Sequence, residues 1–72
     1  MSSPTVLFLF DTTHHALWAE QIATRLALAA QVVPAPADSD AKCDLAIEVL
    51  AEDAKTLEDA LTAEGVLHRI RR

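Results

Sequence analysis

The chain has 72 residues, of which 51% are hydrophobic, and carries a formal net charge of −5. The apolar content argues against disorder, and the length predicts one small domain over residues 1–72 with a modest core. The acidic balance argues against nucleic-acid binding, because phosphate contacts require lysine and arginine. One cysteine excludes both an internal disulfide and a cysteine-rich zinc site, and it suits the reducing cytoplasm.

The first element expected along the chain is a strand. Thr5–Phe10 is a continuous apolar run rich in β-formers, which predicts a strand buried on both faces. The run is too short to cross a bilayer, and it lacks the basic region and cleavage site of a signal peptide. We therefore expect no membrane association. Asp11, Thr12 and Thr13 follow, and each is a candidate helix N-cap.

A helix is expected next, from His14 to about Ala30, because this stretch contains neither glycine nor proline. Small apolar residues recur there at spacings of three and four, which predicts a stripe that packs closely on a sheet. The stripe consists of Ala16, Ala19, Ile22, Ala23, Leu26 and Ala30. Trp18 falls on the outward side, where we expect a half-covered surface residue rather than a partner contact.

The second half of the chain predicts two more strands, a helix and a final strand. Gln31–Ala35 is a short apolar run, and Asp44–Leu50 alternates between apolar and other residues in a way that gives one face to a core. Acidic residues open the next helix at Glu52, where they suit the helix dipole, and Gly65 stands where a left-handed C-cap is needed. Val66–Ile70 then predicts the last strand.

The resulting order, β-α-β-β-α-β, predicts an α/β (α+β) fold of the ferredoxin-like type. In this two-layer sandwich a four-stranded antiparallel sheet has the spatial order 4-1-3-2, and both helices cover one face. The end of the first strand and the start of the first helix then lie at one rim of the sheet. The end of the second strand and the start of the third lie at the same rim. Asp11–His15, Pro34–Pro36 and Cys43 should therefore converge.

The sulfur of Cys43 is expected to lean towards the helix layer. Cys43 shares the strand parity of Leu45, Ile47 and Val49, which places it near the start of the first helix. Unpaired backbone N–H groups and the positive end of the helix dipole stabilise anions there, and this lowers the pKa of a thiol. A neighbouring lysine would add to the effect and neighbouring aspartates would oppose it, so the sequence leaves the balance open.

Three segments resemble a family of very small bacterial proteins described as selenium- or sulfur-carrier-like, whose function is formally unassigned. Phe10–Glu20 reads FDTTHHALWAE and is similar to the family's Phe-x-Ser/Thr-Thr-His-x-Ala-Leu-x-Ala-Glu. Val33–Pro36 resembles its Pro-x-Pro after the second strand, and Ala41–Ile47, AKCDLAI, resembles its Ser-x-Cys-Gly-Leu-Ala-Leu. The resemblance covers nearly the whole chain. Two positions depart from it: Asp44 replaces the family's glycine, and Ala37 stands where arginine is frequent.

The resemblance implies a sulfur or selenium carrier that acts through a persulfide on Cys43. Transfer needs one accessible thiol and no second cysteine to resolve it as a disulfide, which a single cysteine satisfies. Thr12 and Thr13, with the amides of the first helix, would stabilise the terminal sulfur anion, and His14 would orient or exchange a proton. Donor and acceptor proteins would be the partners, no cofactor is expected, and the chain would be a carrier or accessory protein rather than a stand-alone enzyme.

Two other functions stay open on the sequence alone. The sheet face away from the helices should be apolar, which predicts a non-catalytic interaction module that binds a partner or a second copy of the chain as a homodimer. His14, His15 and Cys43 could form a weak soft-metal site, although adjacent helical residues point about 100° apart and so reach one ion poorly.

Overall fold

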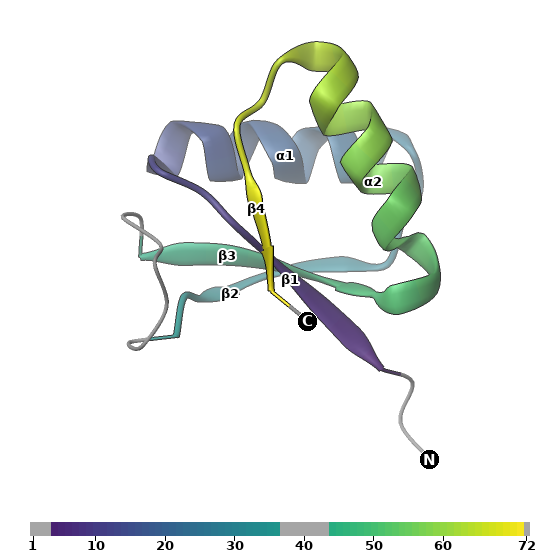
Figure 1. The fold of residues 1–72 in the computed structure, drawn as a ribbon, viewed down its shortest axis with the longest axis horizontal. Coiled ribbons are helices and arrows are strands. Elements are labelled where there is room, and N and C mark those ends of the chain that lie inside the picture. Colours follow the sequence, from purple (N-terminus) through teal and green to yellow (C-terminus); the bar gives the residue numbers. More distant parts are fainter. Residues whose placement is uncertain (1–3, 37–43, 72) are drawn as a thin grey trace.

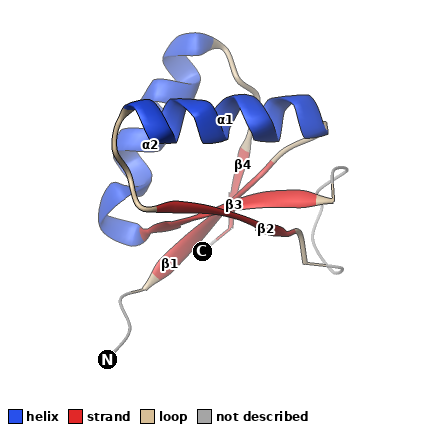
Figure 2. Ribbon diagram, turned by 180° about the vertical axis from the view of Figure 1, so that it is seen from behind, coloured by secondary structure: helices blue, strands red, loops and turns tan. Residues whose placement is uncertain are grey.

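The computed structural model describes residues 4–36 and 44–71, which form two helices on one side of a four-stranded sheet (Figure 1). The elements are β1 (Thr5–Leu9), α1 (Thr13–Arg25), β2 (Ala30–Pro34), β3 (Leu45–Leu50), α2 (Ala51–Glu64) and β4 (Arg69–Arg71). Their order in the sheet is β2-β3-β1-β4, and all three pairings are antiparallel. The predicted strand order and the placement of both helices on one face are confirmed (Figure 2).

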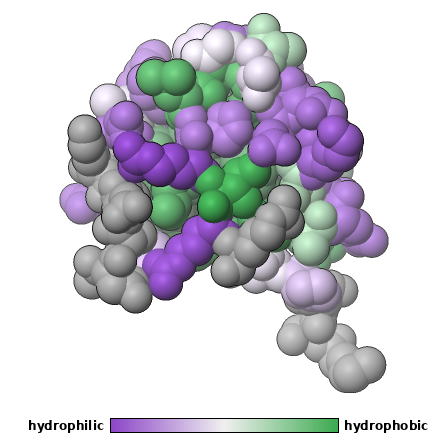
Figure 3. Space-filling model, viewed as in Figure 1, coloured by the Kyte–Doolittle hydropathy of each residue, from purple (hydrophilic) through white to green (hydrophobic). Residues whose placement is uncertain are grey.

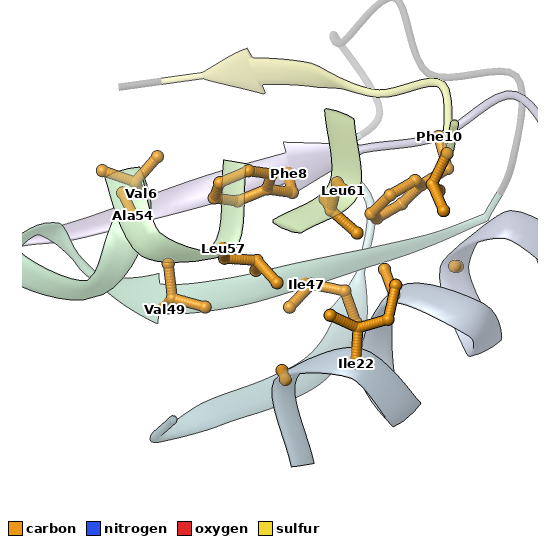
Figure 4. Close-up of a cluster of buried hydrophobic side chains, with 13 residues drawn as sticks. Val6, Phe8, Phe10, Ile22, Ile47, Val49, Ala54, Leu57 and Leu61 are labelled. Carbon is orange, nitrogen blue, oxygen red and sulfur yellow. The ribbon is translucent and has the colours of Figure 1, made fainter. Parts of the chain in front are cut away.

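The core lies between the sheet and the two helices (Figure 4). Phe8 and Ile47 are register partners in the two central strands, and both are fully buried. Helix α1 contributes Ala16, Ala19, Ile22 and Ala23, and helix α2 contributes Ala54, Leu57 and Leu61. Small residues dominate the α1 stripe, so its backbone can approach the sheet closely. The sequence pattern correctly identified Ala16, Ala19, Ile22 and Ala23 as buried.

Helix α1 is shorter than predicted: it ends at Arg25, and its C-cap is Leu26. Ala27 then adopts a left-handed conformation with φ of 58°. The Leu28 N–H donates to the Ala23 carbonyl at 3.0 Å, and the Ala27 N–H donates to the Thr24 carbonyl at 3.0 Å. This pair of bonds is the Schellman motif, here built without glycine. The prediction of a helix to Ala30 is wrong, and Leu26, assigned to the buried stripe, is 42% exposed.

Replacing Ala27 by glycine is expected to stabilise the protein by about 0.5–1 kcal/mol. The Cβ of alanine is strained in the left-handed region, and this strain exceeds the entropy that glycine adds to the unfolded chain. Ala29→Gly is the matched control, because Ala29 is also exposed but has no positive φ. Urea unfolding followed by far-UV circular dichroism measures both. If Ala27→Gly and Ala29→Gly destabilised the protein equally, this would contradict the left-handed conformation of Ala27.

The last strand begins later than predicted, at Arg69 rather than Val66. Gly65 does form the left-handed C-cap of α2, with φ of 77°, as the sequence indicated. The Val66 N–H then donates to the Leu61 carbonyl at 2.9 Å, so this residue closes the helix end instead of pairing in the sheet. Strand β1 ends at Leu9, whose register partner is Arg69, and β4 cannot pair with β1 before that residue.

Candidate functional site at the N-terminus of helix α1

The predicted rim forms, as far as the described residues reach. The register places Leu9 of β1 opposite Ala46 of β3, and Pro34 of β2 opposite Leu45 of β3. The end of β1, the end of β2 and the start of β3 therefore share one edge, beside the start of α1 (Figure 1). The Ala35 N–H extends the ladder by donating to the Asp44 carbonyl at 2.8 Å.

Cys43, the predicted sulfur-bearing residue, lies outside the described residues, as does Ala37. The strand that follows Cys43 has the parity that the sequence indicated. Ile47 and Val49 are buried in the core between the sheet and the helices, and Leu45 packs against that core. Asp44, the first described residue after the gap, is exposed.

Thr12 is the N-cap of α1. Its extended backbone, with φ of −139° and ψ of 154°, lets its Oγ1 accept a hydrogen bond from the His15 N–H at 3.1 Å. The same Oγ1 lies 3.0 Å from Nδ1 of the His15 ring. The Thr12 carbonyl accepts the first helical bond, from the Ala16 N–H at 3.2 Å. Of the three N-cap candidates in the sequence, the structure therefore selects Thr12.

The role of His15 was missed from the sequence. A capping box from Thr13 would need Glu or Gln at position 16, where the sequence has Ala16. Counted from Thr12 instead, His15 occupies that position, and its ring and backbone both bind the threonine hydroxyl. The signal that could have found it is threonine followed three residues later by a side chain with a ring nitrogen.

His14 and Thr13, the other two predicted binding residues, lie in the exposed first turn of α1. The His14 ring is 6.1 Å from the ring of His15 and 6.2 Å from that of Trp18, measured between centroids. Trp18 is half-buried and packs against the core, as predicted. The first turn of α1 contains no acidic residue, and Asp11, which directly precedes the N-cap, pairs with Arg69.

Within residues 4–36 and 44–71, no three His, Cys, Asp or Glu side chains lie close enough together to hold a metal ion. The metal site considered from the sequence needed Cys43 as a third ligand, and that site lies partly outside the described residues.

An ion pair lies next to the rim, where Arg69 Nη2 of β4 is 3.3 Å from Asp11 Oδ1. Neither described helix is long and apolar enough to span a membrane.

Replacing Thr12 by alanine is expected to destabilise the protein by about 1 kcal/mol, because the first turn of α1 loses its side-chain cap. Thr24→Ala is the control. The Thr24 hydroxyl donates to the Glu20 carbonyl within the same helix at 3.0 Å, and losing this exposed bond should change the free energy of unfolding by less than about 0.5 kcal/mol. The urea midpoints of the two variants, each compared with that of the wild type, measure the two losses of stability. Equal losses would mean that Thr12 does not cap the helix.

Comparison with known proteins gives one family. Residues 5–69 match the family model described as "Putative Se/S carrier protein-like". The match covers more than half of the chain and includes both Cys43 and the whole first turn of α1. No curated protein and no solved structure matches the chain.

Proposed function

Because the chain belongs to the Se/S carrier protein-like family, we propose that it carries sulfur or selenium between a donor and an acceptor protein as a persulfide or selenide on Cys43. The observation that carries the proposal is that the family match spans residues 5–69 and so contains the chain's single cysteine. A thiol that must stay reduced between transfers fits a reducing compartment, and we place the protein in the cytoplasm.

The proposed chemistry is two successive sulfur transfers. The Cys43 thiolate attacks the terminal sulfur of a donor persulfide, R–S–SH; the donor S–S bond breaks, a new S–S bond forms on Cys43, and the donor leaves as RS⁻. An acceptor nucleophile then attacks the terminal sulfur, and Cys43 leaves as a thiolate. No external oxidant is needed, because the sulfane sulfur keeps its oxidation state through both steps.

The first turn of α1 supports this proposal from the described side of the rim. The loaded group is an anion at neutral pH, and the first amides of a helix together with its dipole favour a negative charge. Thr12 holds the turn in place, Thr13 offers a hydroxyl in the same turn, and His14 offers an exposed imidazole that can exchange a proton. We assign these three residues to cargo binding and Cys43 to the transfer itself.

The experiment is to incubate the reduced protein with a low-molecular-weight persulfide and to record its intact mass. One sulfur atom should be added per chain and should be lost again on treatment with a dithiol reductant. A parallel incubation with a selenotrisulfide, RS–Se–SR, tests selenium as the cargo, because attack of the Cys43 thiolate on selenium forms an S–Se bond and releases RS⁻. A chain whose mass does not change with either reagent would contradict the proposal.

The open face of the sheet supplies a second, compatible role: we propose that a donor, an acceptor or a second copy of the chain binds there. Leu7, Val33 and Leu50 are partly exposed on this face. This face exposes less apolar surface than the sequence predicted, because Leu9 and Ala46 are buried. The charged Glu48 also lies beside Leu7 there. Sedimentation that is independent of concentration would argue against a homodimer.

A further inference from the structure

The edge of the sheet formed by β4 combines three properties. Strand β4 pairs with β1 on one side, and among the described elements none pairs with its other side. It also packs little against either helix, so its outer edge faces away from the rest of the domain (Figure 1). An exposed strand edge presents backbone N–H and C=O groups that can pair with another extended segment.

The side chains of this edge alternate in a defined way. The register puts Arg71 beside Leu7 and Arg69 beside Leu9, both on the open face of the sheet. Ile70 lies beside Phe8 on the helix face and is partly exposed. Figure 3 shows this side of the molecule, where strongly hydrophilic side chains surround a smaller apolar area. Any strand added here would therefore place its first and third side chains next to arginines.

A hollow lies at the start of this edge. It has a volume of about 210 Å³ and is lined by Leu9, Asp11, Leu67, His68 and Arg69. Leu67 is 66% exposed, the largest exposed fraction among the large apolar side chains described. The hollow has room for one apolar side chain at the end of an added segment.

Charge decides what can occupy the edge. Pairing β4 with β4 of a second copy would put arginine beside arginine, which is destabilising across a strand pair. Five acidic residues of the described chain lie on α2, which is already helical, and Glu48 lies in β3, which is already paired on both sides. These charges favour an acidic segment of a different protein as the occupant.

We propose that the β4 edge binds an extended acidic segment of a partner protein by strand addition. Carboxylates two residues apart lie beside Arg69 and Arg71, an apolar residue between them lies beside Ile70, and an apolar residue two positions further on enters the hollow next to Leu67. The existing pair between Arg69 and Asp11 does not oppose this, since it is partly solvent-exposed and a guanidinium can serve two carboxylates. This inference does not depend on the cargo.

The test uses two capped peptides, Glu-Val-Glu-Thr-Leu and Lys-Val-Lys-Thr-Leu, titrated into the isotope-labelled protein at low salt. The acidic peptide should shift the amide resonances of residues 67–71 and of β1, and the lysine peptide should leave them unchanged. Raising the ionic strength from about 20 to about 300 mM should weaken the acidic peptide's binding at least about threefold.

Two variants identify the arginines as the cause. Arg71→Glu, which leaves the Asp11 pair intact, should weaken the binding of the acidic peptide at least about fivefold. Arg25→Glu, on the exposed side of α1, is the control and should change neither titration. Three results would each overturn the proposal: no shift at β4, equal binding of both peptides, or an Arg71→Glu chain that binds like the wild type.

Discussion

A Phe8→Ala chain is expected to lose about 3–5 kcal/mol of folding free energy. Phe8 is fully buried at the centre of the sheet, where it lies between Ile47 and Ile70 in the register. Its ring also lies 5.7 Å from that of His68, measured between centroids. Removing a buried aromatic ring costs both its transfer free energy and that of the cavity it leaves. A domain of this size has a total stability of about 4–11 kcal/mol, so the variant should be largely unfolded near room temperature or melt far below the wild type.

Leu7→Ala is the matched control for Phe8→Ala. Leu7 is the adjacent residue of β1 but points to the open face and is only partly buried, so its loss should cost about 1 kcal/mol. Urea unfolding, followed by far-UV circular dichroism and by the fluorescence of Trp18, the only tryptophan, measures both variants. Equal destabilisation by the two substitutions would contradict the assignment of the core to the helix side of the sheet.

A Cys43→Ser chain is expected to gain no sulfur from a persulfide donor under conditions in which the wild type gains one atom per chain. The hydroxyl of serine is a poor nucleophile for sulfane sulfur at neutral pH, whereas a thiolate is a good one. A melting curve on the same sample checks that the variant is folded, so that lost loading can be assigned to the lost thiol. A Cys43→Ser chain that gains the same mass would place the sulfur elsewhere.

A second variant tests whether position matters as well as chemistry. Ala29→Cys in the Cys43→Ser background returns one thiol to an exposed site just before β2, at the end of the sheet away from the start of α1. This thiol should take up sulfur at least about tenfold more slowly than Cys43, because the first turn of α1 is distant from it. Equal rates would mean that any exposed cysteine performs the reaction.

The fold was predictable because its signals are periodic. Strand parity placed Ile47 and Val49 in the core, and the spacing of Ala16, Ala19 and Ala23 placed one face of α1 there. The crossover rules then left one compact arrangement, which the structure confirms. Gly65 was identified as a cap because its left-handed conformation is costly for other residues.

The ends of elements were harder to predict, for a physical reason that Ala27 illustrates. Nothing local stops a helix in an alanine-rich stretch, and alanine is a poor choice for a left-handed cap. The chain turns there because Leu28 and Ala30 pack against the core, and that gain exceeds the local strain. Val66 shows the same effect, because it takes part in the C-terminal cap of α2 although valine favours strands.

The rim of the sheet was predictable in its location and less so in its detail, and the place of Cys43 on it stays a prediction. Topology alone predicted that the end of β2 and the start of β3 share one rim, and the register confirms this for Pro34 and Leu45. The choice of Thr12 as the cap and the participation of His15 depend on side-chain geometry that no periodicity encodes. Strand parity also did not reveal that Ala46, on the open face of the sheet, is fully buried.

The most direct test of the carrier role follows one sulfur atom through both transfers. The protein is loaded with a persulfide donor, freed of excess donor, digested without reduction and mapped by mass spectrometry; a parallel loaded sample receives cyanide, which removes sulfane sulfur as thiocyanate. We predict the added sulfur on the peptide that contains Cys43 and one thiocyanate released per loaded chain. An unmodified Cys43 peptide, or sulfur that cyanide cannot remove, would contradict the proposed function.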